Sequence, residues 1–491
     1  MQYSDESLQA IEGIGPERLW HFFYEISRIP RESGNEEGMR RYLLAFAKTH
    51  GIEALCDPTG NIVFHAGPTK GCEKIPSVAL QGHMDMVCVK DEGVVHDFTK
   101  DPLRLRRDGD HLKAVGTTLG ADNGIAIALI LDLFSDLQAQ HGPLEAIFTV
   151  SEETGLEGAF GLDASMIKSR LLLNLDSEEE GVFYIGCAGG VEVDATLPIE
   201  WKDIPLEDEQ WSLVVDNLLG GHSGAEVDKQ RANAIACSAR FLRELDTVST
   251  IRIASVLGGT KRNVIPSLCK TVFSIPKEDH AKALRVASQV LRDIQAEYAF
   301  SDPQANLTIA VQKRTCRKAS SPAQSRKLID ALFITPYGVD RMSMSIPGLV
   351  ETSSNLAVIR MTDRSFEIVT SQRSSIISSR DYITERTRAA LETCGATCEL
   401  QNPYPAWTPD INSPLAGLCT KTWKTFVGTP AKITAIHAGL ECGIINSLIP
   451  GMDSVSIGPN LYGVHSTGET CSISSTARIA AFLRHLLITI Q

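Results

Sequence analysis

Polar residues stand directly after an apolar run in the segment SVALQGHMDMVCVK. Ser77–Leu80 has the composition of a buried strand, and His83 and Asp85 follow it with a single residue between them. The same arrangement recurs along the chain, where an apolar run or a Gly-containing turn is followed by an acid or a histidine. The further residues of this kind are Asp122, Glu152, Glu153, Asp176 and, in a loop near the C-terminus, His465. Because ligand sites gather at the carboxyl ends of strands in open α/β sheets, we expect these side chains to meet.

The chemistry of such a cluster follows from its charge. Five carboxylates in one cleft repel one another unless they are protonated or neutralised by cations. Histidines among them favour zinc-like ions, because calcium and magnesium prefer shells made of oxygen alone. Two divalent ions that share one bridging carboxylate match this number of ligands. Such a pair polarises a carbonyl and generates hydroxide near neutral pH, so the pattern predicts metal-assisted hydrolysis.

Each of these residues also has a structural explanation when it is taken alone. Asp122 precedes a helical stretch and could be only an N-cap. The pair Glu152–Glu153 could lie in a solvated turn, and His83 could be a hydrogen-bonded core histidine. The recurrence of the pattern favours a shared metal site over these separate explanations.

The elements that position these residues form an α/β pattern. From about residue 17 to 190, short apolar strands alternate with helical stretches, which predicts a mostly parallel mixed sheet flanked by helices. The clearest strands besides the opening one are EAIFTV (145–150) and LLLNLD (171–176). The nearly all-apolar stretch GIAIALILDLF (124–134) predicts a helix buried between other elements.

A second texture interrupts this pattern from about residue 191 to 400. Strand-like 211–218 precedes helical 229–245, and strand-like 365–373 precedes helical 380–394. These repeats predict an inserted α+β lid domain built from two similar halves. The α/β pattern resumes after the Pro-rich segment QNPYPAWTPD. We therefore expect a catalytic domain in two parts, 1–190 and 405–491, with the lid domain at 191–404.

Composition narrows the class of protein. The formal net charge of -13 argues against a protein that binds nucleic acid or anionic membranes, because binding to either depends on an excess of Lys and Arg. No apolar run approaches the roughly 18 residues that a membrane-spanning helix needs. The 12 cysteines are scattered and form no CxxC pair. Scattered thiols fit a reducing compartment, so we expect a cytoplasmic protein.

Six segments carry a resemblance to a known family. They are GHMDMV, LGADNGI, SEETGLEGA, NLDSEEEG, GGHSG and GVHSTGE. They resemble the signature segments of the aminoacyl-histidine dipeptidases, also called cytosolic non-specific dipeptidases, within the dizinc aminoacylase/carboxypeptidase superfamily. The resemblance covers essentially the whole chain, in the same order and spacing.

The resemblance implies how the ligands are shared between two zinc ions. His83 and Asp176 would bind one ion, and Glu153 and His465 the other. Asp122 would bridge the two. Co²⁺ or Mn²⁺ are possible substitutes for Zn²⁺ in such a centre.

The resemblance also implies catalytic roles for two further acids. Glu152 would be the general base, which takes a proton from the attacking water and later delivers it to the leaving amine. Asp85 would hydrogen-bond the far nitrogen of His83 and so fix its tautomer and basicity. The peptide bond between Asp122 and Asn123 is expected to be cis.

Substrate contacts are implied for the predicted lid domain and the segment after it. His222 in GGHSG would stabilise the oxyanion of the tetrahedral intermediate. Asn263 and Arg373 match substrate-binding positions, and Arg373 suits a C-terminal carboxylate. Gly439 in HAGLECG matches a position whose backbone contacts substrate.

The sequence leaves alternatives open for the carboxylate-binding arginine and for the roles of two further residues. Arg360 and Arg364 lie near Arg373 in the sequence and could bind the carboxylate instead. His437 and Glu441 are interpreted as structural residues or as supports of the site, with direct metal contact as the alternative.

The sequence therefore predicts a zinc-dependent enzyme that hydrolyses unblocked dipeptides, including Xaa-His dipeptides, with a homodimer as its candidate assembly. One alternative is a related dizinc amidohydrolase that acts on N-acyl amino acids. Another, from a different class, is a non-catalytic metal-binding scaffold. The presence of Glu152 beside a full set of ligands argues against the scaffold.

Overall fold

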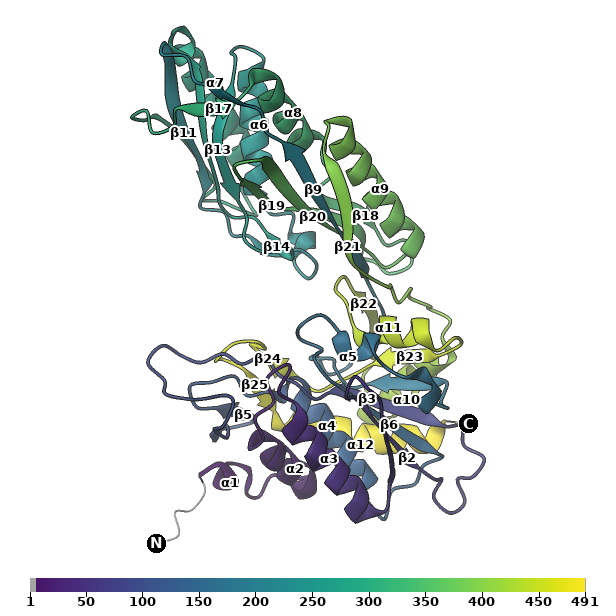
Figure 1. The fold of residues 1–491 in the computed structure, drawn as a ribbon. Helices are drawn as coiled ribbons and strands as arrows, with labels where there is room; N and C mark the ends of the chain where they lie inside the picture. The colour runs from purple at the N-terminus through teal and green to yellow at the C-terminus, as the bar shows by residue number, and fades with distance from the viewer. Residues whose placement is uncertain (1–5, 491) are drawn as a thin grey trace. The chain divides into compact units, whose positions relative to one another are not determined.

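The structure is a computed structural model that describes residues 6–490. The chain divides into two compact units. The discontinuous unit is made of residues 6–187, Pro409–Ala435 and residues 440–490. The inserted unit is made of Ala188–Thr408 and Ile436–Gly439. Figure 1 shows both, with labels on most of their elements.

The discontinuous unit alternates helices and strands over most of its length. Its helices are α1 (Glu6–Ile11), α2 (Glu17–Ser27), α3 (Glu37–His50), α4 (Ala121–Phe134), α5 (Glu157–Phe160), α10 (Pro414–Val427), α11 (Glu441–Leu448) and α12 (Ile473–Thr489). Its strands are β1 (Glu53–Cys56), β2 (Ile62–Ala66), β3 (Val78–His83), β4 (Leu105–Asp108), β5 (His111–Ala114), β6 (Leu144–Thr149), β7 (Leu171–Asn174), β8 (Val182–Cys187), β22 (Lys432–Ile436), β23 (Asp453–Ser456), β24 (Leu461–Tyr462) and β25 (Thr470–Ser472).

Eight of these strands form one mixed sheet in the order β1-β2-β6-β3-β7-β23-β8-β22. Strands β6, β3, β7 and β23 pair in parallel at its centre, whereas β1–β2, β2–β6 and β23–β8 are antiparallel. His83 pairs with Thr149 and Gln81 with Asn174, so the carboxyl ends of β3, β6 and β7 are nearly level. The predicted mixed α/β class is confirmed.

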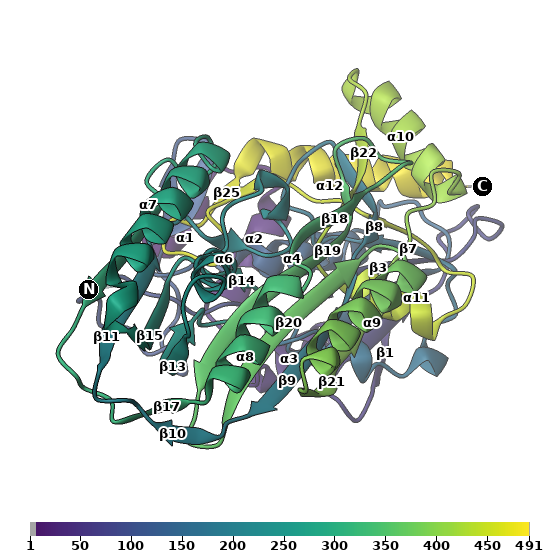
Figure 2. The same cartoon turned by 90° about the horizontal axis from the view of Figure 1, so that it is seen from above.

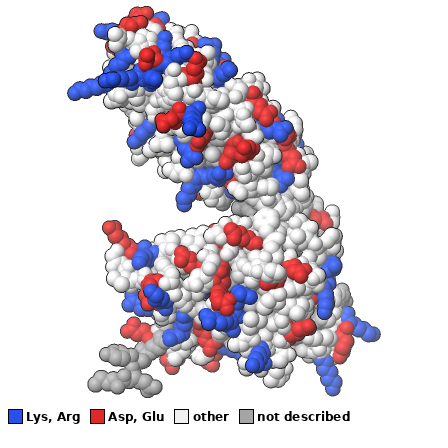
Figure 3. Space-filling view, in the orientation of Figure 1, with Lys and Arg blue, Asp and Glu red and all other residues white. Residues whose placement is uncertain are grey.

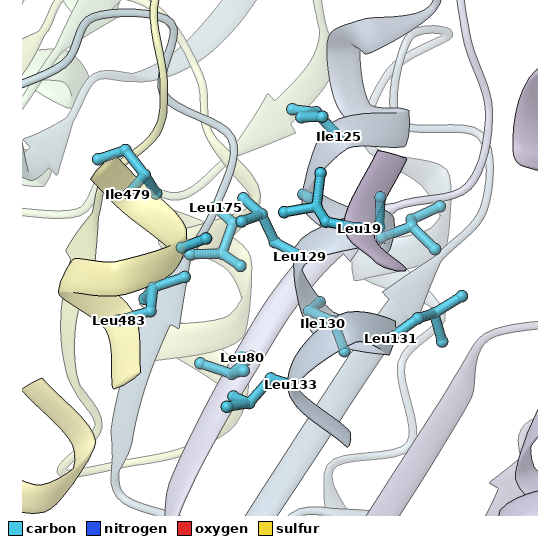
Figure 4. Packing of buried hydrophobic residues seen from close by; sticks show 14 of the residues in the cluster. Leu19, Leu80, Ile125, Leu129, Ile130, Leu131, Leu133, Leu175, Ile479 and Leu483 are labelled. Atoms are coloured by element: carbon cyan, nitrogen blue, oxygen red, sulfur yellow. The ribbon is translucent and has the colours of Figure 1, made fainter. Parts of the chain in front are cut away.

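Helix α4 lies inside the discontinuous unit, as its apolar sequence predicts. Figure 4 shows Ile125, Leu129 and Leu133 of α4 among Leu19 of α2, Leu80 of β3 and side chains of α12, which include Ile479 and Leu483. The labelled leucines and isoleucines are all buried. The helix also contains a buried acid, Asp132, which is paired with Arg18 and Arg484. These ion pairs are needed because an unpaired carboxylate is costly in an apolar layer.

The inserted unit is built on a separate sheet. Its main helices are α6 (Ala234–Asp246), α7 (His280–Glu297), α8 (Pro322–Ile334) and α9 (Ile377–Thr393). Its strands are β9 (Gly189–Pro198), β10 (Trp201–Asp203), β11 (Asp208–Asp216), β12 (Gly221–His222), β13 (Arg252–Gly258), β14 (Val264–Ile265), β15 (Cys269–Pro276), β16 (Asn306–Val311), β17 (Lys318–Ser320), β18 (Gly338–Met342), β19 (Val350–Met361), β20 (Ser365–Ser374) and β21 (Thr397–Tyr404).

The main sheet of the inserted unit has two halves with the same topology. The first half runs β11-α6-β13-β15-α7-β16 along the chain, with the strands side by side in the order β16-β11-β15-β13. The second half runs β9-α8-β19-β20-α9-β21, with the strands in the order β21-β9-β20-β19. The halves join where β13 pairs with β19. The four helices lie on this sheet (Figure 2). The buried side chains of this unit form a core of their own.

The correspondence between the halves differs from the one expected from sequence. The stretch 211–218 with 229–245 falls on β11 and α6, the first strand and helix of one half. The stretch 365–373 with 380–394 falls on β20 and α9, the third strand and second helix of the other. The reason is that β9, the first strand of the second half, precedes the whole first half in the chain.

Charged side chains are spread over the surface of each unit. Figure 3 shows acidic and basic residues interspersed on the displayed face of both. In the described part of the chain, no helix combines the length and the apolar character that crossing a bilayer requires.

Candidate metal centre

Three parallel strands of the discontinuous unit bring the predicted ligands to one edge of the sheet. His83 is the last residue of β3, Glu152 and Glu153 follow the end of β6, and Asp176 follows the end of β7. Because β3 lies between β6 and β7, these loops emerge side by side. The sequence-based expectation that these residues meet agrees with this geometry.

Asp122 lies between the two histidines. Its Oδ1 is 3.1 Å from His83 Nε2, and its Oδ2 is 3.1 Å from His465 Nε2. Each carboxylate oxygen therefore faces a different imidazole. The Asp122–Asn123 peptide bond is cis, as the resemblance implies.

The remaining acids complete two groups around Asp122. Asp176 Oδ1 is 3.4 Å from His83 Nε2, and Glu153 Oε1 is 3.0 Å from His465 Nε2. Ligand atoms that lie within 4.8 Å of one another form the groups His83–Asp122–Asp176 and Asp122–Glu153–His465. A third group of this kind is His83–Glu152–Glu153. The first two groups share Asp122, which is the arrangement that two neighbouring ions need.

The electrostatics of the cluster fit a bound cation. Burial raises the pKa of Asp176 to about 7, and the charges of Asp122 and Glu153 add to this rise against the effect of His83. Burial also raises the pKa of Glu152 well above its usual range. Asp176 Oδ1 is buried and, among residues 6–490, has no hydrogen bond besides its 3.4 Å ionic contact with His83 Nε2. Crowded carboxylates with an unsatisfied oxygen are stabilised by positive charge.

Asp85 holds both His83 and the loop after β6. It is fully buried, and its Oδ1 is 3.3 Å from His83 Nδ1. Its two oxygens accept hydrogen bonds from the backbone N–H groups of Glu152 (3.0 Å) and Glu153 (3.2 Å), and Ser33 Oγ donates at 2.7 Å. Burial alone would raise the pKa of Asp85, but the hydrogen bond and charge of His83, with the hydrogen bonds from Ser33 and from the Glu152 N–H, keep it below its usual value. Asp85 thus fixes the imidazole and the two glutamates together.

Glu469 and Arg31 hold the segment that presents Asp122, and sequence reasoning missed both. The Glu469 carboxylate accepts hydrogen bonds from the backbone N–H groups of residues 119–122, at 2.7 to 3.3 Å. Buried Arg31 donates to the carbonyl oxygens of Asp85 and Gly120. Glu469 could have been found because it ends the segment GVHSTGE. Arg31 has no local signal, since its acceptors are carbonyls from distant parts of the chain.

Glu441 is held by residues of β3 and β6. Its side chain is fully buried and accepts hydrogen bonds from Thr149 Oγ1 at 2.8 Å and from Gln81 Nε2. Burial raises its pKa to about 7. Among the described residues, it belongs to none of the groups close enough to hold a metal. Its contacts are those of a supporting residue.

In the inserted unit, hydrogen bonds select one tautomer of His222. Its Nδ1 accepts hydrogen bonds from the backbone N–H groups of Gly224 (3.2 Å) and Ala225 (2.9 Å). The neutral ring therefore carries its proton on Nε2. Burial and the nearby Arg373 guanidinium lower the pKa of His222 and so favour this neutral form. His222 is a hydrogen-bond donor through Nε2.

The other predicted substrate residues belong to the same inserted unit. Asn263 precedes β14, which pairs with the β12 strand that contains His222, and the Asn263 carbonyl accepts from Ser223 N–H at 2.9 Å. Gly439 ends the short returning segment Ile436–Gly439. Arg373 is 9% exposed on β20. The alternative Arg360 is exposed and paired with Glu367, and Arg364 is also exposed.

Comparison with known proteins identifies the family. Residues 79–489 match the model of peptidase family M20/M25/M40. The chain is 38% identical over 484 residues to the cytosol non-specific dipeptidase of Escherichia coli, covering 98% of this chain and 99% of that protein.

Solved structures agree with the sequence comparison. The aminoacylhistidine dipeptidase of Vibrio alginolyticus superposes with a TM-score of 0.89 at 35% identity, covering 98% of both chains. The aminopeptidase PepT of Bacillus cereus shares the fold, with a TM-score of 0.57 at 17% identity over 96% of this chain and 98% of that one. The resemblance found in the sequence is confirmed. The chain belongs to peptidase family M20/M25/M40 and is a peptide-bond hydrolase.

Proposed function

We propose that this peptidase hydrolyses unblocked dipeptides, including Xaa-His dipeptides, with the help of two divalent metal ions. The observation that carries the proposal is the position of Asp122, whose two oxygens each lie 3.1 Å from a different histidine. The relatives named as dipeptidases support this substrate class because they match the chain over nearly its whole length.

The donor set fits zinc. His83 and Asp176 would hold one ion, Glu153 and His465 the other, and Asp122 both. Nitrogen and carboxylate oxygen together suit zinc, with Co²⁺ and Mn²⁺ as possible substitutes. When bound, such a pair polarises a carbonyl and lowers the pKa of water. Asp176 Oδ1, which is buried and accepts no hydrogen bond within the described residues, supports a cation at this position.

Glu152 is assigned the proton transfers. Its backbone N–H is held by Asp85 Oδ1, which anchors the loop that presents the side chain. The carboxylate would take a proton from the attacking water and return it to the nitrogen of the leaving amine. A raised pKa suits this role, because a general base works best when its pKa lies near the operating pH. Burial raises the pKa of Glu152 in this direction.

Asp85 is assigned to positioning. Its contact with His83 Nδ1 keeps the proton of that imidazole on the side away from the ligand nitrogen. Its carboxylate accepts hydrogen bonds from the backbone N–H groups of Glu152 and Glu153, which fixes the positions of the proposed base and of one proposed ligand.

The inserted unit is assigned to substrate binding, in agreement with the role expected for residues 191–404. The Nε2–H group of His222 would donate a hydrogen bond to the oxyanion, and the two donors at its Nδ1 support that tautomer. Asn263 and the backbone of Gly439 would contact substrate. Arg373 would bind the C-terminal carboxylate. We further propose a cytoplasmic location, with a homodimer as a possible assembly.

The experiment that tests this function is a substrate panel on metal-reconstituted enzyme. It compares free dipeptides, their N-acetylated forms, tripeptides and N-acetyl amino acids. Cleavage of free dipeptides, with N-acetylated compounds resistant, is expected. Preference for N-acetyl amino acids would instead favour the amidohydrolase alternative, and inactivity on the whole panel with both metals bound would favour a non-catalytic scaffold.

A further inference from the structure

Arg373 is a nearly buried cation that has no ionic partner among residues 6–490. It lies on β20, is 9% exposed, and forms no salt bridge with any carboxylate among the described residues. A buried guanidinium is costly unless its N–H groups are satisfied. The partners that it does have therefore decide what else it can bind.

One Arg373 nitrogen is engaged by a tyrosine. Arg373 Nη1 donates a hydrogen bond to Tyr404 Oη at 2.6 Å. Tyr404 is the last residue of β21, and β9 separates β21 from β20 in the sheet. The contact therefore spans a whole strand.

Gly190 of β9 makes this contact possible. It pairs with Arg373 on one side and with Tyr404 on the other. A Cβ at Gly190 would collide with the Tyr404 ring. Because glycine has no side chain, the tyrosine can lie across β9 and reach the guanidinium.

The other edge of the guanidinium, Nε–Nη2, has no hydrogen-bond partner among the described residues. Arg373 Nε is buried without a hydrogen bond, and Nη2 forms none within the described chain. A guanidinium binds a carboxylate through two parallel N–H groups. With Nη1 held by Tyr404, the pair that can do so is Nε–H and Nη2–H. A carboxylate there would also satisfy the buried Nε–H.

We propose that Tyr404 is a positioning residue that turns the Nε–Nη2 edge of Arg373 toward the C-terminal carboxylate of the substrate. The proposal rests on the proposed dipeptidase function. It adds that Tyr404 contributes to the requirement for a substrate with a free C-terminal carboxylate. Tyr404 does not touch the scissile bond in this account. Its effect passes through the orientation of Arg373.

The test compares Tyr404→Phe with wild type on an Xaa-His dipeptide and on the C-terminal amide of the same dipeptide. The phenylalanine keeps the ring over Gly190 and removes only the hydroxyl. The ratio of kcat/KM for acid over amide should fall roughly 10-fold, mainly through KM for the acid, because a hydrogen bond to a charged group is lost. Rates on the amide should change little. Tyr382→Phe is the matched control, since Tyr382 is exposed on α9, and its ratio should equal that of wild type.

A double-mutant cycle with Arg373→Lys checks that the effect passes through Arg373. Lysine lacks the two parallel N–H groups of a guanidinium, so the ratio of kcat/KM for acid over amide should fall roughly 100-fold. Adding Tyr404→Phe to this variant should cause little further loss. An unchanged ratio in Tyr404→Phe overturns the inference while the dipeptidase function stands. Equal wild-type rates on acid and amide also overturn it. Wild type that cleaves neither compound contradicts the proposed function itself.

Discussion

Glu152 and Glu153 are neighbours in the chain with different surroundings. Glu153 Oε1 lies 3.0 Å from His465 Nε2, close to Asp122. The Glu152 carboxylate has no hydrogen bond or ion pair within the described residues, although its backbone is held by Asp85. The contacts of Glu153 are those expected of a metal ligand. The Glu152 carboxylate has the freedom that a proton carrier needs.

Glu152→Gln should therefore keep both metals and lose turnover. A general base contributes about 10²–10⁴-fold, so kcat should fall by that factor while metal content stays at the wild-type level. Glu153→Gln should instead lose metal first. Elemental analysis after dialysis, paired with steady-state kinetics, measures both variants. Near-normal activity of metal-loaded Glu152→Gln would remove Glu152 from the role of base.

His437 gives the inserted unit a predictable response to acid. It is 5% exposed, and burial, together with the Arg373 charge, lowers its pKa to about 3. An unfolded histidine has a pKa of about 6.5, so below that value the unfolded state binds the extra proton. The stability that comes from neutral His437 is therefore complete above about pH 6.5 and is lost as pH falls toward 3.

His437→Gln should flatten this dependence. Between pH 7 and pH 5, the free energy of unfolding of wild type should fall by about 2 kcal/mol more than that of the variant. Urea titrations of metal-free protein at the two pH values measure the difference. Parallel pH dependence in both proteins would contradict the assignment.

At the scale of elements, local patterns predicted the parts of the site that end apolar strands. The strand expected at 77–80 is β3, which begins at Val78 and continues to His83 because residues 81–83 keep pairing with β6. The contributions of Arg31 and Glu469 were not predictable in this way. They act on backbone groups of distant segments, and only the folded chain brings these together.

Glu469→Gln tests how the start of α4 is held. The carboxylate accepts four backbone N–H groups, and an amide would turn an NH₂ group toward these donors. Displacement of Asp122 should weaken metal binding about 10–100-fold, as for other supports of metal ligands. Chelator competition measures this affinity. Glu179→Gln, at an exposed position, is the control. Equal metal affinities in the two variants would contradict the role of Glu469 in holding the start of α4.

At the scale of the whole molecule, the two units have separate hydrophobic cores. The interruption of the α/β pattern between about residues 191 and 400 indicated an inserted domain. The pairing of its halves was not predictable, because β9 is separated from the rest of its half by more than a hundred residues. The predicted metal ligands all belong to the discontinuous unit.

Metal removal should therefore act unevenly. A ligand that binds only the native state stabilises the part that holds it. Chelation should lower hydrogen-exchange protection in β3, β6, β7 and α4, while β11, β13 and β15 keep theirs. Exchange measured by mass spectrometry on holo and apo protein resolves these segments. Equal loss in both units would contradict this assignment.

The shared carboxylate of Asp122 is the centre of the account, and metal titration of apo protein tests it most directly. Wild type should bind two ions per chain and recover dipeptidase activity as the second is bound. Asp122→Asn should weaken both sites together, whereas Glu153→Gln should weaken one. Saturation of wild type by a single ion, or an Asp122→Asn variant that keeps one site at full affinity, would contradict the account.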